Sequence, residues 1–188
     1  MKVTSFELKP LEKSEYLFPY LATYTQEGKQ KTWEIVKAGD SVAILLYHKE
    51  EDTFVLVKQF RPPVYANGHK DGMTIELCAG LVDKPLSLEQ IAIEEIEEEC
   101  GYKITPKDIQ KITSFYTSVG FAGSKQTLYY ATIDESMRVS KGGGIDDELI
   151  EVVYLSKSEA KKLMFDEDIL KTPGLLFAFS WWFNNHKS

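Results

Sequence analysis

The chain has 188 residues, of which 43% are hydrophobic and 27% charged, so it can bury one sizeable core and is not a disordered chain. Its formal net charge of −7 argues against nucleic acid or an anionic membrane as a partner. No apolar run reaches the length of a membrane span, and residues 1–10 lack the apolar segment of a signal peptide. With two cysteines, neither a disulfide framework nor a zinc cluster is expected, and we expect a cytoplasmic protein.

The N-terminal part of the chain has the pattern of a β-hairpin. Residues 20–25 and 32–37 are strand-like and flank a polar turn that contains Gly28. We therefore expect two parts, an N-terminal strand extension over residues 1–40 and a main domain over residues 41–188.

The main domain mixes strands with helices. Strands are predicted where β-branched and apolar residues concentrate, at 41–47, 53–60, 111–118, 126–134 and 148–155. Pro62 and Pro63 end the second of these strands, and residues 64–72 are expected to form a polar loop. Helices are predicted at 88–100, 158–164 and 173–184. Because the order is not a regular βαβ alternation, the expected fold class is α/β in the broad, α+β sense, with a mixed β-sheet sandwiched between helices.

The helix predicted at 88–100 has clear end signals and an unusual charge. Ser87 and Gln90 fit a capping box at its start, and Gly101 fits a left-handed residue at its end. Within the helix, residues 94–99 include five glutamates. Like charges one turn apart destabilise a helix by roughly 0.2–0.5 kcal/mol per pair, so the cluster needs a reason.

Three of these glutamates point in one direction. Glu95, Glu98 and Glu99 fall within an arc of roughly 100° beside the apolar stripe of the helix. A bound divalent cation would neutralise their repulsion, and hard carboxylate oxygens suit Mg²⁺ or Mn²⁺. The alternative for an acidic run by itself is a solvated helix face.

Residues 80–102 resemble the Nudix box, whose pattern is G-x5-E-x7-R-E-U-x-E-E-x-G-U, with U a bulky apolar residue. The positions that fit, with no insertion or deletion, are Gly80, Glu95, Ile96, Glu98, Glu99, Gly101 and Tyr102. Two positions depart from the pattern, since Leu86 replaces its first glutamate and Glu94 replaces its arginine. In the family this arginine usually pairs with a glutamate and orients it.

The resemblance covers nearly the whole chain. Segments similar to the ADP-ribose pyrophosphatase group of Nudix enzymes are 32–34, 57–63, 76–80 and 148–152. Segments similar to its uridine diphosphate glucose pyrophosphatase branch are 76–83, 98–102, 123–127 and the triple glycine 142–144. Ala38 stands where the ADP-ribose branch has a basic residue, which favours a UDP-sugar.

The family's fold and reaction follow as expectations from this resemblance. It implies a Nudix fold and a Mg²⁺-dependent hydrolase, with Mn²⁺ as a possible substitute, that splits the diphosphate of a nucleoside diphosphate sugar. The foremost substrate is UDP-glucose, giving UMP and glucose 1-phosphate. Two alternatives stay open, an ADP-ribose pyrophosphatase and a catalytically weak Nudix-fold nucleotide-binding protein, which the departures at Leu86 and Glu94 would suit. The N-terminal strands often exchange across a homodimer in the family, so a homodimer is expected.

The resemblance also implies the metal ligands and the catalytic groups. The implied metal ligands are the backbone carbonyl of Ala79 and the side chains of Glu95, Glu98, Glu99 and Glu148. Glu98 would ligate or assist catalysis. Glu148 would ligate or act as the general base, with Asp146 as the alternative base, although loop carboxylates can also be simply solvated.

Part of the expected substrate site lies in the first strands. Trp33 and Glu34 resemble the aromatic platform and polar partner that hold the base, although an aromatic ring in a hairpin is more often a packing residue. Arg61 could fork onto phosphate oxygens, with a surface ion pair as the alternative.

The other expected contacts lie at strand ends and in a loop. Glu76 would contact metal, water or substrate, or else cap a neighbouring turn. Gly120 and Ser124 belong to a small-residue loop whose backbone amides could approach the sugar or a phosphate, with a tight turn as the alternative.

Overall fold

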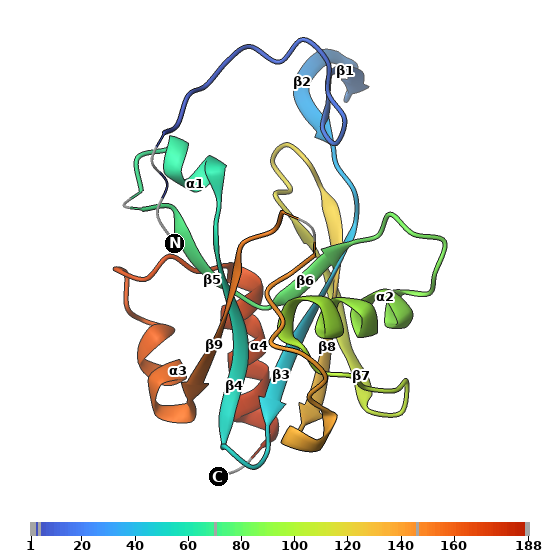
Figure 1. The fold of residues 1–188 in the computed structure, drawn as a ribbon. Coiled ribbons are helices and arrows are strands. Elements are labelled where there is room, and N and C mark those ends of the chain that lie inside the picture. Colours follow the sequence, from blue (N-terminus) through green and yellow to red (C-terminus); the bar gives the residue numbers. More distant parts are fainter. Residues whose placement is uncertain (1–2, 4, 70, 146, 187–188) are drawn as a thin grey trace.

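The computed structural model describes residues 3, 5–69, 71–145 and 147–186. Seven strands of this part of the chain form one mixed sheet (Figure 1): β3 (Ser41–His48), β4 (Thr53–Phe60), β5 (Met73–Glu76), β6 (Cys78–Leu81), β7 (Ile109–Thr117), β8 (Ser124–Ile133) and β9 (Ile150–Ser156). The main order is β5-β4-β3-β8-β7, with β6 paired to β3 and β9 paired to β4. Strands β3 and β8 run parallel, and the other pairs are antiparallel.

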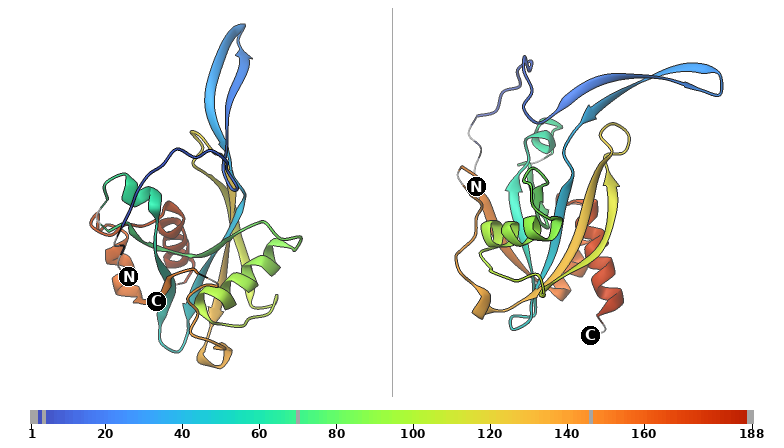
Figure 2. Two further views of the ribbon diagram at one scale, coloured as in Figure 1. Left: turned by 45° about the horizontal axis from the view of Figure 1, so that its top comes forward. Right: turned by 90° about the vertical axis from the view of Figure 1, so that its right-hand side faces the viewer.

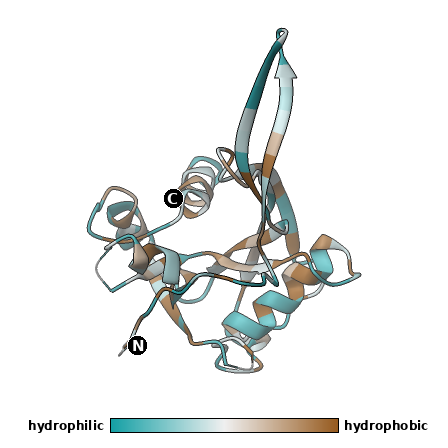
Figure 3. Cartoon of the chain, turned by 90° about the horizontal axis from the view of Figure 1, so that it is seen from above, coloured by the Kyte–Doolittle hydropathy of each residue, from teal (hydrophilic) through white to brown (hydrophobic). Residues whose placement is uncertain are grey.

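Helices cover both faces of the sheet and make two separate cores. On one face, α2 (Leu88–Glu95) and the π-helical turn η1 (Ile96–Cys100) bury Ile91 and Ile96 completely. On the other face, α3 (Lys157–Leu163) and α4 (Pro173–Asn185) contribute buried side chains such as Phe179. In Figure 3, α2 at the lower right alternates teal and brown, as expected for a helix with one face buried. The prediction of a mixed sheet between helices is therefore confirmed.

The N-terminal hairpin is a separate two-stranded sheet. It pairs β1 (Phe18–Gln26) with β2 (Lys29–Lys37) and projects away from the domain like an arm (Figure 2). Glu27 and Gly28 have positive φ of 52° and 75°, as a two-residue turn of this kind requires. The predicted hairpin is confirmed, and each strand is longer than the sequence pattern indicated.

One local prediction was wrong. Strand β4 ends before the prolines as predicted, but residues 64–66, which were expected to start a polar loop, belong to the short helix α1 (Pro62–Ala66). The reason is that a proline is well accommodated in the first turn of a helix, where its missing N–H is not needed. The chain leaves β4 through this helical turn.

Candidate functional site

A cavity of about 450 Å³ is lined by six acidic residues of the chain. It lies beside β6 and the helix α2–η1, which are neighbours in Figure 1. Its lining includes Arg61, Glu76, Ala79, Gly80, Glu95, Glu98, Glu99 and Glu148. The whole lining comes from six separate segments of the sequence, and it includes all five residues that the resemblance suggested as metal ligands.

Glu99 is the most deeply placed carboxylate of the cavity. Its side chain accepts a hydrogen bond from the backbone N–H of Ala79 at 2.9 Å, and the residue is 5% exposed. Burial raises the pKa of Glu99 to about 8, although the hydrogen bond from Ala79 opposes the shift. A buried carboxylate of this kind is costly to charge unless a cation lies beside it.

Glu95 lies one turn before Glu99, and its carboxylate is likewise costly to charge because it is partly buried. Burial and the charge of Glu98 raise its pKa to about 7. Its carboxylate lies against Gly80, where a Cβ atom would come within 2.0 Å of Glu95 Oε1. Glycine at position 80 therefore allows the helix carboxylate to lie directly on strand β6. Carboxylates of raised pKa that line one cavity fit the hard-oxygen ligands that Mg²⁺ or Mn²⁺ prefers.

The end of the carboxylate helix is wider than an α-helix. Residues 96–100 form a π-helical turn, and Gly101 ends it with φ of 78° in the left-handed region. The expected capping box at Ser87 and the expected role of Gly101 are both confirmed. Extra-wide turns of this kind occur frequently at functional sites. Here the turn contains Glu98 and Glu99 and brings both to the cavity.

The triple glycine is docked on this helix end. The N–H of Gly143 donates to the carbonyl of Glu99 at 2.9 Å, and that of Gly144 donates to the carbonyl of Glu98 at 3.1 Å. A Cβ atom on Gly142 would lie 2.3 Å from the carbonyl oxygen of Glu99. The glycines therefore satisfy helix-end carbonyls at close approach, which is a different role from the hinge that glycine repeats also suit.

We expect Gly142→Ala to lower the free energy of unfolding by about 2–4 kcal/mol. The cost combines a left-handed φ of 66° with overlap onto a backbone atom that cannot move aside. Urea denaturation followed by circular dichroism measures it. Gly120→Ala is the matched control, because a Cβ atom there meets nothing within 4 Å and its φ is not positive. Equal stability of the two variants would contradict the docking of this segment.

Known families and proteins match this chain. The model of the NUDIX domain matches residues 37–172. The chain belongs to the NUDIX family. It is 42% identical to the uridine diphosphate glucose pyrophosphatase of Bos taurus, over 91% of this chain and 90% of that protein. The corresponding Mus musculus protein is 39% identical over the same shares, and the GDP-mannose pyrophosphatase of Pectobacterium atrosepticum is 41% identical over 71% of this chain and 67% of that protein.

These matches confirm the family resemblance, and this Nudix chain is a hydrolase that acts on diphosphate bonds, as predicted.

The helices of the structure were also compared with the requirements of a membrane span. Across the described residues, no helix combines the length and the apolar character that a membrane crossing requires.

In this Nudix chain, Arg61 is already engaged by a carboxylate. Its Nε and Nη2 donate to the two oxygens of Glu76, each at 2.7 Å, so the fork is bidentate. Thr74 also donates to Glu76. The hydrogen bond with Glu76 is the main reason that the pKa of Arg61 is raised. Both residues line the cavity, but the guanidinium that was expected to bind phosphate is directed at Glu76.

Glu148 lies at the mouth of the cavity, in the segment before β9. Its Oε2 accepts the backbone N–H of Ile145 at 3.1 Å, and its own N–H donates to the carbonyl of Ile145. The loop thereby holds its carboxylate by local hydrogen bonds. Asp146, the alternative base, lies outside the described residues.

Four expected substrate contacts do not line this cavity. Trp33 and Glu34 lie on the arm, where the indole N–H of Trp33 donates to the carbonyl of Gly120 at 2.7 Å. The hydroxyl of Ser124 donates to the carbonyl of Ala38 at 3.4 Å. The bond of Trp33 connects the arm to the loop before β8, and that of Ser124 connects β8 to the residue after β2.

Sequence reasoning assigned no role to five polar residues that line the cavity, namely Ser41, Gln59, Asp83, Lys84 and Gln126. Gln59 lies at the end of β4, Gln126 in β8 and Lys84 between β6 and α2. Both glutamines lie in segments that resemble the family, 57–63 and 123–127, but no role was assigned to either side chain. Lys84 did carry a signal, since it lies inside the Nudix-box segment and an acidic residue occupies the arginine position at Glu94.

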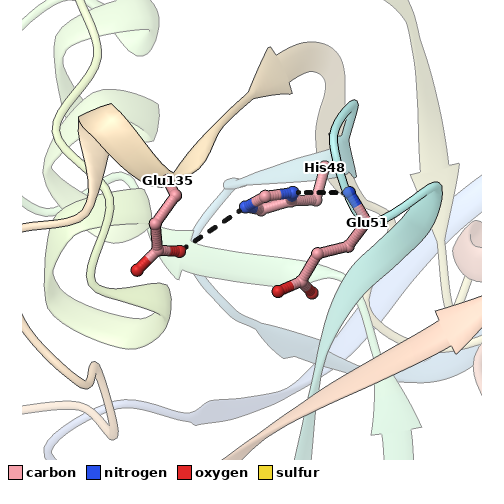
Figure 4. Close-up of side chains that lie close together, drawn as sticks. All are labelled: His48, Glu51 and Glu135. Atoms are coloured by element: carbon pink, nitrogen blue, oxygen red, sulfur yellow. Dashed lines mark hydrogen bonds and ion pairs between the residues drawn. The ribbon is translucent and has the colours of Figure 1, made fainter.

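A second group of possible metal ligands lies at the far end of β3, where Figure 4 shows His48 with Glu51 and Glu135. The buried ring of His48 directs Nε2 toward Glu135 at 3.7 Å, and its Nδ1 accepts the backbone N–H of Glu51 at 3.3 Å. An accepting Nδ1 places the proton of a neutral ring on Nε2, which then has no lone pair for a metal. The hydrogen bond from Glu51 therefore argues against His48 as a metal ligand.

Proposed function

We propose that this chain hydrolyses the diphosphate of nucleoside diphosphate sugars, with UDP-glucose as the preferred substrate and UMP and glucose 1-phosphate as products. The observation that carries the proposal is the cavity in which Glu95, Glu98, Glu99 and Glu148 converge. The similarity to a uridine diphosphate glucose pyrophosphatase over nine-tenths of both chains supports this substrate, and Ala38 favours it over ADP-ribose.

The proposed cofactor is Mg²⁺, with Mn²⁺ as a substitute. Its ligands would be the carboxylates of Glu95, Glu98, Glu99 and Glu148 and the carbonyl of Ala79. When bound, the cation supplies Lewis-acid polarisation of the diphosphate and neutralises its charge. Burial raises the pKa values of Glu95 and Glu99, which supports this assignment, because a buried carboxylate is costly to charge unless a cation lies beside it.

Substrate preference tests the function directly. UDP-glucose, GDP-mannose and ADP-ribose are incubated separately with and without Mg²⁺, and the monophosphate products are detected after phosphatase treatment. We expect metal-dependent cleavage with the highest kcat/KM for UDP-glucose. A preference for GDP-mannose or for ADP-ribose would move the assignment to that substrate. GDP-mannose is included because a bacterial relative is named a GDP-mannose pyrophosphatase. No cleavage of any of them would favour a nucleotide-binding protein.

Glu148 is proposed as the general base that takes a proton from the attacking water, with Asp146 as the alternative. Glu148→Gln keeps the shape and the hydrogen bond from Ile145 but cannot accept the proton. We expect kcat to fall by more than about tenfold, in line with general-base contributions. The control is Glu151→Gln, an exposed carboxylate on β9 outside the cavity. An unchanged kcat in the Glu148 variant would move the base to another residue.

We also propose a homodimer in which the arm of each chain reaches its partner. The arm exposes large apolar side chains, namely Phe18, Tyr20, Leu21, Tyr24 and Trp33. Surfaces of this kind commonly mark interaction sites. A dimer would also let Trp33 and Glu34, which do not line the cavity of their own chain, contact a substrate in the cavity of the partner.

Gel filtration with light scattering should therefore give a mass about twice 21.4 kDa. Deleting residues 1–37 should shift the protein to the monomer mass. A strict monomer in the full-length protein would count against a site completed by the partner.

The proposed location is the cytoplasm. Both cysteines, Cys78 and Cys100, are free and fully buried, as expected for a protein of a reducing compartment. Fractionation of cells that express the tagged chain tests this directly.

A further inference from the structure

A lysine lies between two glutamates at the edge of the cavity. The Nζ atom of Lys84 is 2.8 Å from Glu94 Oε2 and 3.6 Å from Glu98 Oε1. The three side chains are 38%, 42% and 27% exposed, so the ion pairs are only partly open to solvent. Lys84 comes from the segment between β6 and α2, whereas both glutamates come from the carboxylate helix.

The helix geometry explains why this lysine matters. Glu94 and Glu98 are four residues apart, so they lie on the same side of the helix and repel each other. Glu98 lines the cavity and Glu94 does not. Lys84 therefore pairs with Glu94 outside the cavity and with Glu98 inside it, and the contact with Glu94 is the shorter one.

The surroundings offer Glu98 few other cations. Among the described residues that line the cavity, the basic ones are Arg61 and Lys84. The guanidinium of Arg61 is held by both oxygens of Glu76. Lys84 is thus the cation placed to fix the direction of the Glu98 carboxylate.

We propose that Lys84 is a positioning residue that orients Glu98 toward the metal ligands, with Glu94 as its anchor. The Nudix-box pattern has an arginine at position 94, and this chain has the charges exchanged, with an acid on the helix and the cation on the preceding loop. The proposal rests on the proposed function for its effect on turnover, and on the cavity alone for its effect on metal binding.

The first test measures metal binding without substrate. Titration of Mn²⁺ followed by electron paramagnetic resonance gives the dissociation constant of each variant. We expect Lys84→Ala to bind Mn²⁺ about 10- to 100-fold more weakly, the usual effect of removing a partner that orients a ligand. Lys103→Ala is the matched control, because Lys103 pairs with Glu97 on the same helix at 3.5 Å but does not line the cavity. Unchanged binding in Lys84→Ala would overturn the proposal.

The second test is a rescue. An arginine at position 94 would lie one turn before Glu98 and could reach it without the lysine. The double variant Lys84→Ala with Glu94→Arg should therefore recover most of the Mn²⁺ affinity and most of the kcat lost in Lys84→Ala. A double variant as weak as Lys84→Ala would show that Lys84 does not act through Glu98.

Steady-state kinetics separates this role from direct substrate binding. A positioning role predicts a lower kcat in Lys84→Ala at saturating UDP-glucose. A higher KM with unchanged kcat and unchanged Mn²⁺ affinity would instead place Lys84 on the substrate and overturn the proposal. If the wild-type protein cleaves no nucleotide sugar, the proposed function fails, and the Mn²⁺ titrations still decide the role of Lys84.

Discussion

Glu99→Gln should abolish Mg²⁺-dependent turnover and at the same time raise the melting temperature of the metal-free protein. Glutamine has the same shape, and its carbonyl oxygen can still accept the N–H of Ala79. It cannot supply the negative charge that a metal ligand needs here, so we expect kcat to fall by about a thousandfold or more, equivalent to roughly 4 kcal/mol. Stability should rise because the variant no longer buries a group that is costly to charge.

Opposite changes in activity and stability make this prediction specific. A merely destabilised protein would lose both together. Glu97→Gln is the matched control on the same helix, because Glu97 pairs with the exposed Lys103 and does not line the cavity. It should keep both turnover and melting temperature. Turnover at the wild-type rate in Glu99→Gln would remove the metal site from this cavity.

Stability of the metal-free protein should depend strongly on pH, in a direction set by Glu95 and Glu99. Their pKa values rise on folding from the ordinary 4.5 to about 7 and about 8. The folded state therefore holds these protons more tightly than the unfolded state, and the resulting stability is complete below pH 4.5 and is lost as pH rises to 8. We expect the melting temperature without metal to fall between pH 5 and pH 9.

Added Mg²⁺ should remove most of that fall, because a ligand that binds only the folded state stabilises it and this one prefers charged carboxylates. Differential scanning calorimetry with EDTA or with Mg²⁺ measures both curves. The hydrogen bond with Lys49 is the main reason that the pKa of Asp134 is lowered to about 2. Asp134 therefore makes stability rise with pH, but only below about pH 5, so the measurements start at pH 5. A flat curve with EDTA would contradict the assignment of the two raised carboxylates.

Local features of the fold could be predicted because neighbouring residues fix them. The capping box at Ser87, the left-handed Gly101 and the turn at Gly28 each depend on residues a few positions apart. Concentrations of β-branched and apolar residues were likewise enough to predict most of the strands, and the irregular order of strands and helices indicated a mixed sheet. The short helix α1 shows the limit of this reasoning, because prolines after a strand suit either a loop or a first helical turn.

The residues of the candidate site could be predicted only where they belong to one sequence motif or to a segment that resembles the family. Glu95, Glu98 and Glu99 follow from helix periodicity, and their convergence with Glu148 was inferred from family resemblance. The ion pair of Arg61 with Glu76 was not predictable, because it joins the residue after β4 to the neighbouring strand β5. The same holds for Trp33, whose partner Gly120 is 87 positions away.

The sequence by itself determined the family, the acidic helix and the residue types that a divalent cation requires. Only the tertiary structure decided how those charges are compensated. Lys84 lies between Glu94 and Glu98, and the triple glycine packs on the end of the carboxylate helix. The last turn of that helix, which contains Glu98 and Glu99, is π-helical. The physical reason is distance, since charge pairing and close backbone approach act over a few ångströms in space and take no account of separation along the chain.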